Sequence, residues 1–208
     1  MPRIACLHTA PSNAPLFDAA AAPLGLVLTH VVRADLLAAV EARGELTAEI
    51  AAGLTAALAE LAATADAVIL TCSSLGEAVD PEGPVIRADA ALAAAALRDP
   101  GRVAVLYTAP TSRGPTERVF RAAAEAGQGV PEVRCVEGAW AAFRAGDAGR
   151  HIALIRQAMG EAVAAGADRI ALAQCSMAPA GVAGAQGVPV LTVPDAALAA
   201  AMAARGRV

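Results

Sequence analysis

The sequence predicts an α/β protein made of two lobes, each a parallel sheet flanked by helices. Short apolar runs typical of buried strands alternate with alanine-rich segments typical of helices. Two of these runs, 67–70 and 170–173, are each introduced by Ala-Asp, with Arg169 intervening before the second, and each leads into a polar residue, a cysteine and a serine. Asp99-Pro100-Gly101 is the strongest turn signal in the middle of the chain. We therefore expect a first lobe at 1–99 and a second at 100–193, with a helix at 194–208 packing back on the first.

The first lobe is expected to alternate strands and helices from its start. Thr47-Ala48-Glu49-Ile50 resembles a helix N-cap, and leucines repeat after it at helical spacing. The helix that follows is the clearest of the chain. In order, the predicted elements are a strand at 3–8, a helix at 15–22, a strand at 26–32, a helix at 47–63, a strand ending at Cys72, a strand at 84–86 and a helix at 89–98.

The second lobe repeats this scheme. Its predicted elements are a strand at 102–107, a helix at 115–126, a strand at 133–136, a helix at 150–165, a strand ending at 173 and a strand at 190–193. Strands separated by helical segments imply parallel pairing. Ligands of such folds bind beyond the carboxyl ends of the strands.

Composition excludes several classes of function. The net charge is −4 and only 2% of residues are aromatic, which argues against a nucleic-acid partner. No apolar stretch approaches the roughly 20 residues of a membrane span. The chain has no lysine, which excludes an internal Schiff base and a P-loop. The start, Met-Pro-Arg-Ile-Ala-Cys, lacks a signal-peptide pattern and predicts a cytoplasmic protein.

Four polar loops fall at the expected carboxyl ends of strands. They are rich in Ser, Thr and Asn and carry few charges, a combination that suits a carboxylate held by neutral donors. They are 9–13, 71–74, 108–112 and 174–176. The sequence therefore predicts a small-molecule carboxylate ligand at these loops.

The four cysteines divide into two pairs by context. They are widely spaced and form no CxxC pair, so neither a zinc site nor a disulfide framework is indicated. Cys6 and Cys135 lie inside predicted strands and are interpreted as small core residues. Cys72 and Cys175 share the repeated context, each near a helix start where thiolate is favoured, and are interpreted as site residues.

The histidines and arginines give weaker signals. His8 ends a strand beside the predicted site and either assists there or is structural. His30 and His151 are interpreted as structural or surface residues. Arg33, Arg87 and Arg113 are interpreted as solvated, and the pattern selects no arginine for a substrate carboxylate.

Three short motifs resemble one enzyme family. Thr-Cys-Ser-Ser-x-Gly follows the strand at 67–70, Gln-Cys-Ser follows the strand at 170–173, and Tyr107-Thr108-x-x-Thr111 lies between them. Together they resemble the aspartate/glutamate/hydantoin racemase superfamily. The resemblance covers essentially the whole chain, because the order of lobes and loops agrees.

The resemblance implies two Rossmann-like lobes related by pseudo-twofold symmetry, with the active site between them. It implies a cofactor-independent racemase or epimerase of a small carboxylate compound, such as an amino acid or hydantoin. Cys72 and Cys175 would be the catalytic pair, one removing the α-proton and the other returning one. The residues implied to bind substrate are Asn13, Ser73, Ser74, Thr108, Thr111 and Ser176, with His8 as an auxiliary residue. A homodimer is expected.

The sequence departs from the pattern at both cysteines. Ser73 and Ser74 stand where amino-acid racemases of this group have Asn and Thr, and Gln174 stands where they have Gly. Other activities of the superfamily therefore stay open: a decarboxylase or cis–trans isomerase of a small dicarboxylate. A non-catalytic acid-binding or redox-sensing protein is the third alternative.

Overall fold

The chain forms two compact units in the computed structural model, which describes residues 2–80, 83–124 and 131–204. The first lobe comprises Met1–Ala91 and Pro194–Val208, and the second comprises Leu92–Val193. The division falls inside helix α5 (Ala88–Leu97), whereas the Asp-Pro-Gly turn predicts it after Asp99. Arg169 of the second lobe explains the difference, because its guanidinium donates to the carbonyls of Ala96 and Asp99.

The sheet of the first lobe has four parallel strands. They are β1 (Ile4–His8), β2 (Leu28–Val32), β3 (Ala67–Leu70) and β4 (Val85–Arg87), in the order β2-β1-β3-β4. β1 and β3 are central and buried along their length, as their unbroken apolar runs predict. β2 and β4 form the edges and are half-buried for most of their length.

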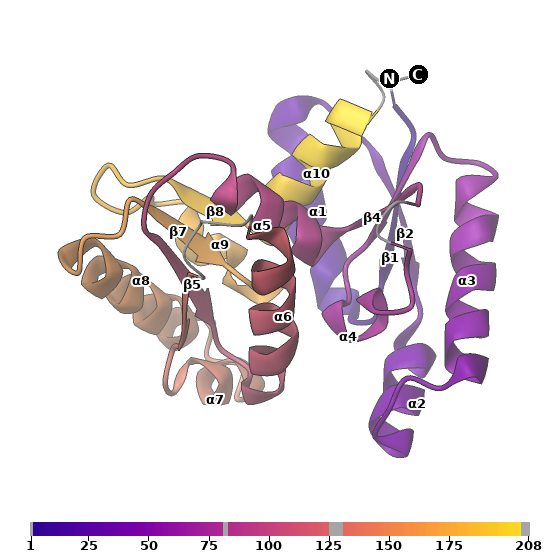
Figure 1. The fold of residues 1–208 in the computed structure, drawn as a ribbon, viewed down its shortest axis with the longest axis horizontal. Helices are drawn as coiled ribbons and strands as arrows, with labels where there is room; N and C mark the ends of the chain where they lie inside the picture. Colours follow the sequence, from indigo (N-terminus) through magenta and orange to yellow (C-terminus); the bar gives the residue numbers. More distant parts are fainter. Residues whose placement is uncertain (1, 81–82, 125–130, 205–208) are drawn as a thin grey trace. The chain divides into compact units, whose positions relative to one another are not determined.

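The sheet of the second lobe repeats this connectivity (Figure 1). Its strands are β5 (Val103–Tyr107), β6 (Glu132–Cys135), β7 (Arg169–Leu172) and β8 (Val190–Thr192), in the order β6-β5-β7-β8. All pairings are parallel. The predicted α/β class with two parallel sheets is confirmed.

Helices cover both faces of the first sheet. α1 (Ala14–Ala21) lies on one face, and α3 (Ala48–Ala62) lies on the other, with α2 (Ala34–Arg43) leading into it (Figure 1). α10 (Val193–Ala204) belongs to this lobe from Pro194 onward. The sequence pattern does not predict α2, because Leu36 is its only fully buried residue and its apolar stripe is correspondingly weak.

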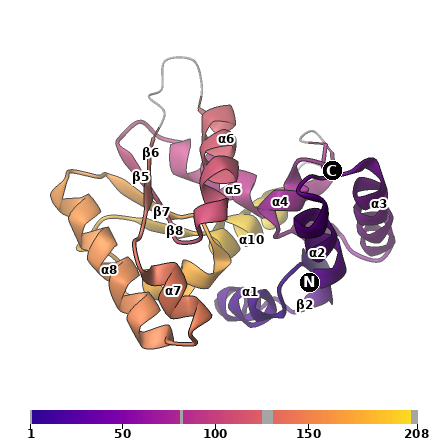
Figure 2. The same ribbon diagram turned by 90° about the horizontal axis from the view of Figure 1, so that it is seen from below.

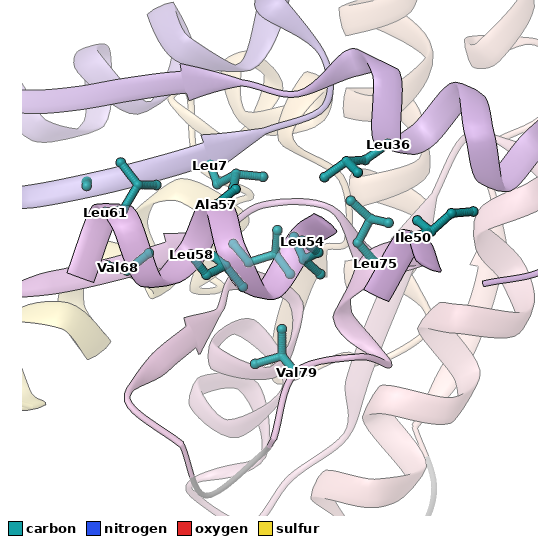
Figure 3. Close-up of a cluster of buried hydrophobic side chains, with 12 residues drawn as sticks. Leu7, Leu36, Ile50, Leu54, Ala57, Leu58, Leu61, Val68, Leu75 and Val79 are labelled. Atoms are coloured by element: carbon teal, nitrogen blue, oxygen red, sulfur yellow. The ribbon is translucent and has the colours of Figure 1, made fainter. Parts of the chain in front are cut away.

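The leucine face predicted for 47–63 packs on the first sheet. Ile50, Leu54, Leu58 and Leu61 all lie in one buried core cluster with Leu7 of β1 and Val68 of β3 (Figure 3). Thr47 is the N-cap, and its side chain accepts a hydrogen bond from the Ile50 N–H. Both the helix and its cap were therefore predicted correctly.

The second lobe is covered by α6 (Arg113–Ala123) and α8 (Ala148–Ala164), on opposite sides of β5 in Figures 1 and 2. Residues 125–126 of the predicted helix at 115–126 lie outside the described residues. α7 (Ala139–Arg144), a short helix, was not predicted. Ile155 and Met159 of α8 pack against Leu106 and Leu172 in this core. Within the described parts of the chain, no helix combines the length and the apolar character that crossing a membrane requires.

The repeated Ala-Asp has a structural role at the amino end of each sheet. The Asp66 carboxylate accepts from the Arg3 N–H at 2.9 Å, and the Asp168 carboxylate accepts from the Arg102 N–H at 2.8 Å. Each aspartate precedes the third strand and ties it to the residue before the first. The motif therefore stabilises the sheets at the end opposite the cysteine loops.

Candidate active site at the carboxyl ends of the sheets

Cys72 and Cys175 occupy corresponding places in the two lobes. Cys72 lies shortly after β3, immediately before the short helix α4 (Ser73–Gly76). Cys175 lies shortly after β7 and begins the 3-10 helix η4 (Cys175–Met177), which leads into α9 (Ala178–Gly181). β3 and β7 are each the third strand of their lobe. The matching sequence contexts thus correspond to matching places in the topology.

Both loops lie at a switch point of the strand order. In each sheet the chain moves outward from the first strand to one edge, then returns to place the third strand on the other side of the first. Ligands of open α/β sheets bind in the crevice that this reversal creates at the carboxyl ends. The loops after β1 and β3 flank that point in the first lobe, and those after β5 and β7 flank it in the second.

Gln174 joins the two loops of the second lobe. Its Oε1 accepts three hydrogen bonds, from Thr108 N at 2.6 Å, Thr108 Oγ1 at 2.8 Å and Ala109 N at 3.0 Å. Its Nε2 donates to Ser112 Oγ at 3.2 Å. The two backbone donors fix the orientation of the amide, since only the carbonyl oxygen can accept from them. Gln174 therefore sets the position of the threonine loop relative to Cys175, a role that the sequence analysis missed.

His151 is hydrogen-bonded to the backbone of the second cysteine loop. The ring is 3% exposed; one nitrogen is hydrogen-bonded to the Ala139 carbonyl at 2.9 Å and the other to the Ser176 carbonyl at 3.1 Å. The histidine is a buried structural residue, one of the two roles expected for it. Its contact with Ser176, 25 residues away, links α8 to the loop that carries Cys175.

His8 joins the two loops of the first lobe. Its Nδ1 lies 2.9 Å from Thr71 Oγ1, and its Nε2 lies 2.8 Å from His30 Nδ1. His30 Nε2 in turn donates to Asp18 at 3.0 Å. Burial, reinforced by the charge of His30, lowers the pKa of His8 to about 4, so this ring is neutral at neutral pH.

The predicted binding residues of the first lobe lie at the starts of helices. Ser73 and Ser74 form the first turn of α4, with Ser74 exposed, and Asn13 is half-buried immediately before α1. Cys72 is half-buried and packs against the core cluster beneath α3. Its thiol is therefore at the boundary between core and surface.

Arg87 is more constrained than a solvated arginine. It pairs with Asp89 at 2.9 Å, and it lies so close to Gly76 that a Cβ there would come within 2.7 Å of its Nε. Because residue 76 is glycine, the Arg87 guanidinium can lie directly against α4, the helix that begins after Cys72.

In the second lobe, Thr108 is 1% exposed, whereas Thr111 is exposed on the 3-10 helix η3 (Pro110–Ser112). Cys175 is buried at 7% exposure, and Ser176 is half-buried. The hydroxyl of Thr108 donates to Gln174, so its hydrogen is already used within the loop. Thr111 is the threonine of this loop with a solvent-accessible side chain.

The other two cysteines lie within strands, as expected. Cys6 is fully buried in β1. Cys135 ends β6 and is half-buried; burial, and then the neighbouring Glu137, raise the pKa of its thiol. A raised pKa disfavours the reactive thiolate.

The cavities found within single lobes lie away from the thiols. One of about 440 Å³ in the second lobe is lined by Arg102, Glu132 and Arg134 toward the amino ends of β5 and β6. Another of about 460 Å³ in the first lobe lies between α3 and residues 78–80 and 83–85. Neither is lined by Cys72 or Cys175.

Comparison with known proteins gives matches at the level of three-dimensional structure. No protein-family model matches the chain, and no curated protein sequence does. Aspartate racemase from Picrophilus torridus is similar, with a TM-score of 0.71 at 11% identity over 98% of this chain and 94% of that one. Allantoin racemase from Klebsiella pneumoniae gives 0.70 at 17% identity, over 99% and 88%. Glutamate racemase from Thermus thermophilus, in complex with β-chloro-D-alanine, gives 0.61 at 14% identity, over 99% and 82%.

These matches extend over nearly the whole chain, so both lobes have the fold of these racemases. The two parallel α/β lobes that the family resemblance implies are thereby confirmed.

Proposed function

We propose that the protein is a cofactor-independent racemase or epimerase that uses Cys72 and Cys175 as two bases at the α-carbon of a small carboxylate compound. The observation that carries the proposal is the equivalence of the two thiols, each following the third strand at the switch point of its own sheet. The likeness in fold to aspartate, glutamate and allantoin racemases supports it.

The reaction needs one thiolate and one thiol. The thiolate takes the α-proton, so that an S–H bond forms, the C–H bond breaks and the electron pair moves into the carboxyl group. The other thiol then gives its proton to the opposite face of the same carbon, and the electron pair returns to form the new C–H bond. The two cysteines thereby exchange protonation states in each turnover, which lets either enantiomer be the substrate.

Stabilising the extra charge on the carboxyl group is the larger part of catalysis, because an α-proton beside a carboxylate is very weakly acidic. We assign this role to the hydroxyls of Ser73, Ser74, Thr111 and Ser176 and to the amide of Asn13. Thr108 acts indirectly in this scheme, because its hydroxyl donates to Gln174. It is a positioning residue that keeps the Thr111 loop beside Cys175.

The test is solvent-deuterium incorporation by the purified full chain. Single enantiomers of amino acids, hydantoins and small dicarboxylates are incubated in D₂O and followed by NMR and chiral chromatography. A two-base enzyme delivers deuterium to the α-carbon of the product enantiomer while the remaining substrate still carries hydrogen. Cys72→Ser and Cys175→Ser should each lower racemisation by about 10²- to 10⁴-fold, the usual contribution of a general acid or base.

Cys135→Ser is the matched control, because that half-buried thiol lies in the edge strand β6 and a serine hydroxyl can still donate to its one contact with the site loop, the Thr108 carbonyl. It should retain wild-type activity. Racemisation that survives either Cys72→Ser or Cys175→Ser would contradict the two-base mechanism. Release of CO₂ from a dicarboxylate that requires only one of the two cysteines would replace it with a one-thiol lyase.

A further inference from the structure

Three metal-binding side chains converge on one face of the first sheet. Cys6 and His8 are two positions apart on β1 and therefore point to the same face. His30 of β2 is the in-register partner of Cys6, which brings its side chain to that face as well. Phe17 of α1 packs edge-on against His8 with ring centroids 5.4 Å apart, so this is the face beneath α1.

The ligand atoms are close enough to share an ion. One atom from each of Cys6, His8 and His30 lies within 4.8 Å of the other two, and His8 Nε2 is 2.8 Å from His30 Nδ1. Tetrahedral zinc bonds of about 2.0 Å to nitrogen and 2.3 Å to sulfur separate such ligands by about 3.3 to 3.6 Å. The two rings need to part by only about half an ångström to reach that spacing.

The remaining ring nitrogens are already held by the kind of partner that orients metal ligands. His30 Nε2 donates to the Asp18 carboxylate at 3.0 Å, and His8 Nδ1 is hydrogen-bonded to Thr71 Oγ1 at 2.9 Å. These bonds direct His30 Nδ1 and His8 Nε2 toward each other. An acceptor behind each imidazole, most often a carboxylate, is typical of zinc sites, where it fixes the tautomer and the orientation of the ring. Thr71 Oγ1 can take this role because its own hydrogen goes to the Leu7 carbonyl.

We propose that Cys6, His8 and His30 form a Zn²⁺ site in the first lobe. One thiolate and two imidazoles are the ligands that zinc prefers over calcium or magnesium, which take oxygen ligands. Water completes the tetrahedron. The ion enters past His30, whose side chain is 18% exposed on the edge strand, and Asp18, which is 61% exposed. The site binds β1 to β2 and is separate from Cys72, which packs on the α3 side of the sheet.

Co²⁺ is the probe, because it replaces Zn²⁺ in tetrahedral sites and a cobalt–thiolate bond gives a near-ultraviolet charge-transfer band. Metal-free full-length protein should develop this band and the visible bands of tetrahedral cobalt with one equivalent, and Zn²⁺ should displace both. The charge-transfer band should be lost in Cys6→Ser and retained in Cys135→Ser and Cys72→Ser. No band in the wild type, or a band lost in Cys72→Ser but not in Cys6→Ser, would overturn the proposal.

A second variant protects the test against misfolding of Cys6→Ser, since Cys6 is fully buried. Asp18→Asn changes an exposed side chain and should leave the far-ultraviolet circular dichroism intact. Its Zn²⁺ affinity, measured by chelator competition, should fall by about 10- to 100-fold, the usual cost of losing a carboxylate behind a ligating histidine. Affinity equal to the wild type would overturn the assigned ligand geometry.

Discussion

Gln174 is the residue on which the second cysteine loop most depends. Its Oε1 accepts hydrogen bonds from two backbone N–H groups and one hydroxyl on the loop after β5. Thr108 and Ala109 are buried, so their N–H groups have no water to replace a lost acceptor. A buried donor without a partner costs about 1 to 3 kcal/mol.

Replacing Gln174 therefore tests this arrangement. Gln174→Leu should lower the free energy of unfolding of the second lobe by about 3 kcal/mol, because two buried N–H groups lose their acceptor. Gln174→Glu keeps an acceptor oxygen for both N–H groups, and the Ser112 hydroxyl can donate to the second carboxylate oxygen, so the free energy lost should be less than half as large. Urea unfolding followed by Trp140, the single tryptophan and a member of α7, reports on this lobe. Equal losses in the two variants would contradict the role of Oε1.

At the scale of elements, helices with their own sequence signals were predictable and those without were not. α3 begins at a capping threonine and carries a leucine face, and both were recognised in advance. α2 and α7 lack such signals, since α2 fully buries only Leu36 and α7 spans six residues. Their helical form depends on packing in the tertiary structure, which a local pattern does not contain.

The Thr47 cap makes a measurable contribution to α3. Thr47→Ala should lower the free energy of unfolding by about 0.5 to 1 kcal/mol, the lower part of the range for N-caps, because its 3.4 Å bond to the Ile50 N–H is long. Thr55→Ala in the same helix is the control. The Thr55 hydroxyl donates to the Ala51 carbonyl on an exposed face. Thr55→Ala should therefore change the free energy of unfolding by less than about 0.5 kcal/mol. Chemical denaturation of both variants gives the comparison, and equal effects would contradict the cap.

At the scale of the molecule, the sequence predicts the repeated lobes but not the contacts that join the loops. The alternation of elements and the two cysteine contexts lead directly to two parallel sheets. The bonds from Gln174 to Thr108 and from His8 to Thr71 join residues 66 and 63 positions apart. Such pairs depend on which strands become neighbours and in what register, and the local sequence pattern specifies neither. The cluster of Cys6, His8 and His30 was missed for the same reason.

Each lobe has its own core, which predicts separable effects of core mutations. Leu54 of α3 and Ile155 of α8 are both fully buried, each in the cluster of its own lobe. Leu54→Ala should cost about 2 to 5 kcal/mol and raise amide hydrogen exchange mainly in β1 and β3. Ile155→Ala should have a similar cost and should raise amide hydrogen exchange mainly in β5 and β7. Hydrogen exchange with mass spectrometry distinguishes the two patterns, and uniform loss of protection in both variants would contradict separate cores.

The aspartates at the amino ends of the sheets also bear on how this fold diverges. Asp66 and Asp168 stabilise one end of each lobe, and the core clusters of the two lobes consist of aliphatic side chains and methionine, which tolerate exchange at similar volume. The loops that carry Cys72 and Cys175 lie at the other end. The loop residues can therefore be substituted to accommodate a new substrate without loss of stability, while core positions exchange one aliphatic residue for another. This separation explains how chains with 11 to 17% identity keep one fold.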